Sequence, residues 1–188
     1  MTEVEDVVIE TVIDRSRNLL LTELVGLIER EHRTESPGIA RGTLGTYADA
    51  LADQPNLQFD PEQFADAIED ARIGTRTWVD GDALYDLGDD RLSVYPQAWH
   101  DRLGGETDVR EYIEYLQSDE SGFADGTPRG GRGDGIDQPT LVDVVSMLGD
   151  IDRNAVQAQI EDRRAEGQLQ KSADQHPEAR VELDRSGT

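Results

Sequence analysis

Apolar side chains recur along much of the chain at the spacing of an amphipathic helix. The first clear segment covers residues 14–33, with leucine and isoleucine three or four positions apart and Asp14 at the N-cap position. Residues 1–14 mix valine and isoleucine with acids, so this segment predicts either a strand or a frayed arm. A second helix is predicted over residues 43–52, where the apolar positions again follow the helical period.

The third predicted helix, residues 60–72, has the clearest start in the chain. Asp60 stands at the N-cap and Pro61 at the first helical position, where a missing N–H is harmless. Phe59 and Phe64 are spaced as a hydrophobic staple across this cap.

The pattern then changes from helical to alternating. Residues 78–79 predict a short strand, and residues 84–87 and 91–95 predict a hairpin around the turn 88–90. Tyr85 and Tyr95 of this hairpin, with Trp78 and Trp99, predict an aromatic cluster. We interpret that cluster as core, with an aromatic interaction patch as the alternative.

Two further helices follow the hairpin. A short one carries Trp99 and Leu103, and the next covers residues 109–116 with Thr107 as its cap. Residues 118–137 are rich in Gly, Asp, Ser and Arg and predict a flexible linker.

The segment after this linker predicts two helices and two strands. Residues 138–148 form the first helix, and Asp152 caps a second helix that ends at Gly167. Residues 169–172 and 180–183 then predict strands.

These elements predict a mainly α fold with small β-hairpins, an α+β class. We expect an N-terminal domain over residues 1–117, a linker over 118–137, a C-terminal domain over 138–184 and a tail over 185–188.

The stretch DVVSMLGDIDRNAVQAQIEDRRAEGQLQ resembles the helix-turn-helix and first wing strand of winged-helix domains. The resemblance covers residues 140–183, about a quarter of the chain. A winged helix has a further helix before this pair, which either residues 109–116 or a partner chain would supply. The N-terminal region has the same order of elements, so the chain resembles a tandem of winged-helix-like domains.

The resemblance implies that the helix over residues 153–166 enters the major groove of double-stranded DNA. Residues off its buried face, together with cations on the wing, would make the contacts, because Arg, Asn and Gln read bases and cations meet phosphate. These residues are Arg153, Asn154, Gln157, Arg164, Lys171 and Arg180. We therefore expect a transcriptional regulator, and a homodimer.

An interaction or scaffold module without catalysis is the alternative. Glu161 and Asp162 share the candidate reading helix and would repel phosphate. The third N-terminal helix is more acidic, which favours scaffolding or dimerisation there. Its carboxylates are Glu62, Asp66, Glu69 and Asp70.

The charge of the chain indicates the kind of solvent to which its surface is adapted. The 188 residues include 41 acidic and 18 basic side chains, giving a net charge of -23, and Lys171 is the only lysine. Acids spread along a chain with clear apolar periodicity are typical of a halophilic surface, because molar salt screens their repulsion. We expect a haloarchaeal source.

The sequence lacks the residues that several classes of function require. There is no cysteine, phosphate-binding loop or dinucleotide fingerprint, and the three histidines have no metal-ligand spacing. We therefore expect no enzyme, no cofactor and no metal. No apolar run approaches a membrane span, and the N-terminus lacks the basic start of a signal peptide, so we expect a cytoplasmic protein.

Overall fold

The chain divides into two compact units, each of which combines helices with a small sheet. Unit 1 comprises Met1–Arg76 and Gly81–Gln97, and unit 2 comprises Thr77–Asp80 and Ala98–Thr188. The structure is a computed structural model, and it describes residues 3–15, 19–123, 135–172 and 180–183. The predicted α+β class is confirmed.

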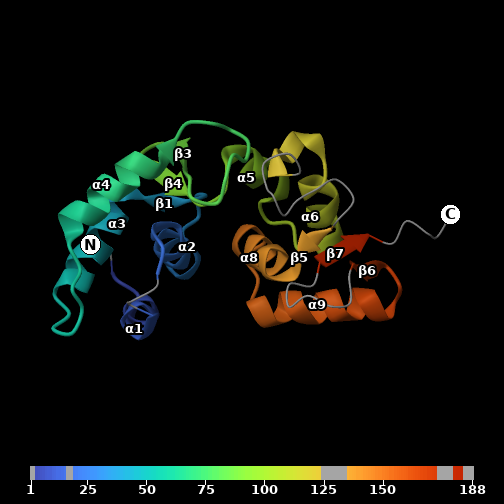
Figure 1. The fold of residues 1–188 in the computed structure, drawn as a ribbon, viewed down its shortest axis with the longest axis horizontal. Coiled ribbons are helices and arrows are strands. Elements are labelled where there is room, and N and C mark those ends of the chain that lie inside the picture. The colour runs from blue at the N-terminus through green and yellow to red at the C-terminus, as the bar shows by residue number, and fades with distance from the viewer. Residues whose placement is uncertain (1–2, 16–18, 124–134, 173–179, 184–188) are drawn as a thin grey trace. The chain divides into compact units, whose positions relative to one another are not determined.

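Unit 1 builds a sheet of four short strands among its helices (Figure 1). Its elements are α1 (Asp6–Arg15), α2 (Leu21–Glu31), β1 (Ile39–Ala40), α3 (Arg41–Ala52), α4 (Pro61–Ala71), β2 (Arg72–Ile73), β3 (Leu84–Gly88) and β4 (Arg91–Ser93). The strand order is β1-β4-β3-β2, antiparallel except for the parallel pair β2–β3. The core lies where α1, α2, α3 and α4 pack together with this sheet.

The start of α4 follows the prediction. The Asp60 carboxylate accepts from the backbone N–H groups of Glu62 at 3.0 Å and Gln63 at 3.2 Å. The rings of Phe59 and Phe64 lie 5.4 Å apart across the cap. The cap satisfies two of the donors that a helix start leaves open, so the sequence fixes this boundary locally.

Two predictions for residues 14–79 are wrong. The helix expected over residues 14–33 is two helices: α1 ends at Arg15 and α2 begins at Leu21. Asp14 therefore lies within α1, and the Glu23 carboxylate instead accepts from the Leu20 N–H at 2.9 Å. Residues 78–79, which belong to unit 2, do not form the expected strand.

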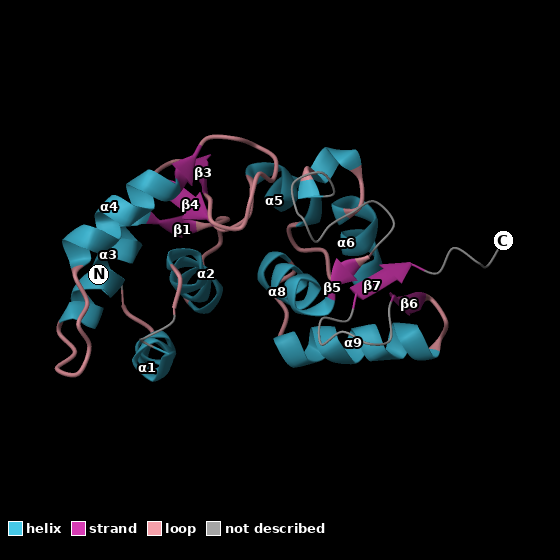
Figure 2. Cartoon of the chain, viewed as in Figure 1, coloured by secondary structure: helices cyan, strands magenta, loops and turns pink. Residues whose placement is uncertain are grey.

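Unit 2 has a three-stranded sheet, drawn in magenta in Figure 2. Its elements are α5 (Gln97–Leu103), α6 (Val109–Leu116), the 3-10 turn η1 (Asp119–Ser121), β5 (Ile136–Asp137), α8 (Gln138–Leu148), α9 (Arg153–Ala165), β6 (Leu169–Ser172) and β7 (Arg180–Leu183). The strand order is β5-β7-β6, all antiparallel. Asp108, not Thr107, caps α6, accepting from Arg110 N at 3.0 Å.

The expected boundary at residue 117 is wrong, because α6 packs against α8, α9 and β7 inside unit 2. Gln159 of α9 holds the start of α6: its Oε1 accepts from Val109 N at 2.7 Å and its Nε2 donates to Thr107 O at 2.8 Å. The predicted linker over residues 118–137 instead joins elements of one unit and includes η1 and β5. Residues 124–134 of that segment lie outside the described residues.

Three aromatic rings form a cluster in unit 2. Trp78 stacks on Trp99 with ring centroids 5.1 Å apart, and the Phe123 ring meets both edge-on at 5.6 and 5.8 Å. Tyr85 and Tyr95, the other two members of the predicted cluster, are buried residues of unit 1. Because the chain has two tryptophans, its indole fluorescence reports on unit 2.

Candidate nucleic-acid interface

The helix α9 begins and ends where its sequence predicts. The Asp152 carboxylate accepts from Asn154 N at 2.8 Å. Val156 and Ile160, one turn apart, are fully buried. Gly167 follows the helix with φ +72°, the left-handed conformation that favours glycine at a helix end. The opposite face of α9 is thereby directed to solvent.

Two of the six predicted contact residues lie fully on that outward face. Asn154 and Gln157 are both exposed, beside the small side chains of Ala155 and Ala158. The first two turns of α9 therefore present amides and methyl groups and no carboxylate beyond the cap, Asp152.

The arginines of α9 make contacts within unit 2. Arg153 pairs with Asp143 of α8 and has 43% of its side chain exposed. Arg164 is only 19% exposed; its Nη1 pairs with Glu161 at 2.7 Å and its Nη2 donates to Gln138 Oε1 at 2.9 Å. Arg164 thus joins the end of α9 to the start of α8, and only Arg153 could turn outward by breaking a single ion pair.

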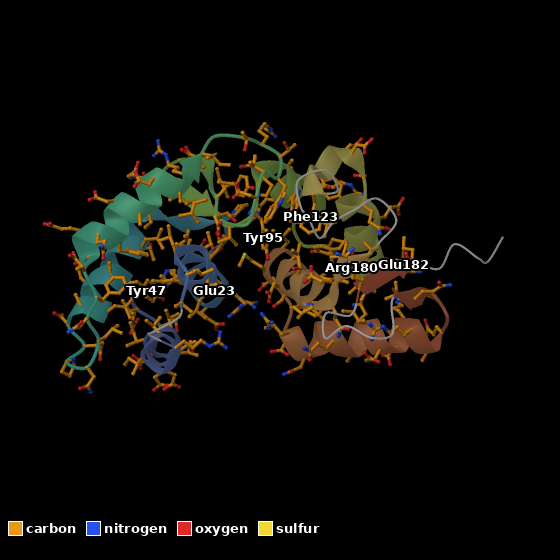
Figure 3. All side chains as sticks on the ribbon, viewed as in Figure 1. Glu23, Tyr47, Tyr95, Phe123, Arg180 and Glu182 are labelled. Carbon is orange, nitrogen blue, oxygen red and sulfur yellow. The ribbon has the colours of Figure 1, made fainter. Side chains whose placement is uncertain are left out.

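The wing residues are less completely described. Lys171 lies on β6, and its side chain is outside the described part of the chain. Arg180 begins β7, pairs in register with Ser172 and is half-buried; Figure 3 labels it next to Glu182.

A charged network joins α6 to α9. Arg110 Nη2 lies 2.6 Å from Asp108 Oδ2, and Arg163 Nη2 lies 3.8 Å from the same oxygen. Hydrogen bonding from Arg110, with the charge of Arg163, holds the pKa of Asp108 below its ordinary value. These groups are part of the helix packing of unit 2.

The two units repeat one sequence pattern, a signal that the sequence reasoning missed. Residues 38–51 read GIARGTLGTYADAL and residues 135–148 read GIDQPTLVDVVSML. Residues 60–72 read DPEQFADAIEDAR and residues 152–164 read DRNAVQAQIEDRR. The repeat aligns β1 and α3 with β5 and α8, and α4 with α9.

Matched residues have matched roles. Gly38 and Gly135 both have φ +73° and precede the first strand of their sheets. At the ends of α4 and α9, Arg72 and Arg164 pair with the glutamate three residues earlier, at 3.6 and 2.7 Å. The matched elements of the two units therefore share these local contacts, although the sheet of unit 1 has one strand more.

The repeat allows the exposed residues of α9 to be compared with those of α4, its counterpart in the same acidic chain. Four exposed positions in the first two turns of α4 carry Glu62, Gln63, Ala65 and Asp66. The matched exposed positions of α9 carry Asn154, Ala155, Gln157 and Ala158. The outward N-terminal half of α9 thus lacks the two carboxylates that α4 carries.

Other kinds of site are not found among the described residues. They contain no group of three or more His, Asp or Glu side chains placed to hold a metal ion. His32 Nδ1 lies 3.1 Å from the Tyr47 hydroxyl in a packing contact of unit 1. None of the described helices has the length and apolar character needed to cross a membrane.

Comparison with protein-family models, with curated proteins and with solved structures found no match.

Proposed function

We propose that the chain is a tandem winged-helix protein in which unit 2 binds double-stranded DNA through α9. In both units a helix, a strand and two helices precede a pair of antiparallel strands, and this order supports the winged-helix part; unit 1 has the additional strand β2 between its last helix and that pair. Among the described residues of unit 2, α6 precedes the helix-turn-helix pair, and in this proposal it is the further helix that the resemblance requires.

The observation that carries the DNA proposal is the carboxylate-free outward face in the first two turns of α9. The N-terminal residues of a reading helix approach base edges, and Asn or Gln can bind adenine with two hydrogen bonds. The partial positive charge of the helix N-terminus also favours nearby phosphate. Asn154 and Gln157 are the residues that contact bases in this proposal. Arg153 joins them by breaking its ion pair with Asp143 and contacting DNA instead.

Molar salt changes which interactions provide the affinity of such an interface for DNA. Counterion release drives much of ordinary DNA binding and weakens as salt rises. A halophilic reader would depend on base contacts and groove shape, which is compatible with a neutral reading face. We extend the proposal to transcriptional regulation by a homodimer, whose two α9 helices would reach half-sites about 34–36 Å apart.

The test is selection of random double-stranded DNA on the full chain in molar KCl, followed by affinity measurement. Asn154→Glu installs the unit 1 residue at the matched place and should weaken binding about tenfold or more. Gln63→Glu adds the same charge to α4 and should leave binding within about twofold. Equal losses in both variants, or the absence of any enriched DNA sequence, would contradict the proposal.

Unit 1 supports a second function. The matched face of α4 bears Glu62 and Asp66, which repel phosphate, so contact with another protein suits this helix better than DNA.

A further inference from the structure

Unit 1 has a pocket of about 400 Å³ between α3 and α4. Its floor is apolar, formed by Leu44 and Ala48 of α3 and by Phe64 and Ile68 of α4. This volume lies in the range of small binding sites, enough for one or two apolar side chains. The pocket is built entirely from unit 1.

The pocket opens at Gly45. A Cβ placed on Gly45 meets no atom within 4 Å, so this position faces open space. The matched residue of unit 2 is Val142, whose side chain is 1% exposed. At this position unit 1 therefore has a glycine where unit 2 buries a valine.

Carboxylates surround the pocket. Asp49, Glu62, Glu69 and Asp90 line its rim. Arg41, the one cation in the lining, pairs with Glu69 and, at 3.4 Å, with Asp90. Among the described residues, Asp49 and Glu62 form no ion pair, so the charge beside the pocket is negative.

We propose that this pocket binds a basic amphipathic segment of a partner protein. An apolar side chain of the segment enters between Phe64 and Gly45, and arginine or lysine side chains meet Asp49 and Glu62. Charge complementarity supports this choice of occupant, because the acidic rim continues onto the outward face of α4 at Asp66.

The two parts of the pocket act differently in molar salt. Attraction between charges a few ångströms apart is largely screened, so the carboxylates select among partners only through direct contact. Burial of the apolar side chain is not screened and provides the affinity. The inference concerns unit 1 and is independent of DNA binding by unit 2.

The test selects random displayed peptides on the full chain in molar KCl and then measures the affinity of the enriched peptides for the unaltered chain and for the Gly45→Val variant. Gly45→Val copies the residue that fills the matched place in unit 2, and valine is no worse than glycine in a helix. Gly42→Val is the matched control, because Gly42 lies one turn earlier in α3, faces open space and is outside the pocket lining. Circular dichroism confirms that both variants fold.

Enriched peptides should combine a large apolar residue with nearby arginine or lysine. Their affinity should fall about tenfold or more in Gly45→Val and stay within about twofold in Gly42→Val, while Glu62→Gln should weaken it severalfold. Peptides that bind Gly45→Val as well as the unaltered chain would overturn the site. Enrichment of peptides without basic residues would overturn the proposed partner chemistry, and the absence of enriched peptides would overturn both.

Discussion

Glu29 of α2 is a carboxylate in the core of unit 1, with 8% of its surface exposed. Its Oε1 accepts from the Ser93 hydroxyl at 2.7 Å and its Oε2 accepts from Val94 N at 3.1 Å. The Ser93 oxygen in turn accepts from Tyr95 N at 3.0 Å. Glu29 therefore joins α2 to the end of β4, where the hairpin leaves the sheet.

Burial raises the pKa of Glu29 from 4.5 to about 7, against the opposing effects of the Ser93 and Val94 hydrogen bonds and the charge of Arg91. The folded state thus binds this proton more tightly than the unfolded state does. The free energy of unfolding therefore falls as pH rises from about 4.5 to 7 and is flat above that range. At roughly 1.4 kcal/mol per pH unit, the contribution lost is about 3 kcal/mol.

Glu29→Gln removes this titration and keeps an amide that can bond both partners. We expect the difference in unfolding free energy between the variant and the unaltered chain to shift by about 3 kcal/mol in favour of the variant from pH 4.5 to 8. Urea denaturation in molar KCl, followed by circular dichroism, measures this difference. Tryptophan fluorescence is the internal control, because both indoles lie in unit 2.

Parallel pH profiles for the two proteins would refute the reasoning, since they would mean that Glu29 titrates alike in the folded and unfolded chains. Asp66→Asn, which removes an exposed carboxylate of α4, controls for the change in net charge.

Three further predictions concern both units. Gly38→Ala and Gly135→Ala should each reduce the unfolding free energy by about 1–3 kcal/mol, because φ is +73° at both glycines and the new Cβ would lie 2.7 and 2.8 Å, respectively, from a strand carbonyl oxygen. Urea midpoints measure this loss, and the control Gly45→Ala, at an open position of α3, should be neutral or stabilising. Phe123→Ala should reduce the stability of unit 2 by roughly 3 kcal/mol and shift tryptophan emission to the red, since it removes a 7% exposed ring from the indole stack; unchanged emission would count against the cluster. Transfer from molar to dilute KCl should reduce helical circular dichroism, because the net charge of -23 is then unscreened, and full stability in dilute buffer would exclude the halophilic interpretation.

The sequence alone predicted most helices and strands, because their signals are local. Asp60 with Pro61, and Asp152 with Gly167, fix the ends of α4 and α9 through caps within a few residues of chain. The helix expected over residues 14–33 failed for the same reason: its apolar spacing continues across a break that no glycine or proline marks.

Tertiary structure decided how these elements group. The composition of residues 118–137 is that of a linker, yet α6 packs on α8 and α9, because burial of its apolar face depends on partners distant in sequence. It also decided which predicted contact residues face solvent. Asn154 and Gln157 do, whereas Arg164 bonds Gln138 of another helix, a contact that no local pattern specifies. Local chemistry sets where a helix begins and ends, and long-range packing sets which of its faces remains available to a partner.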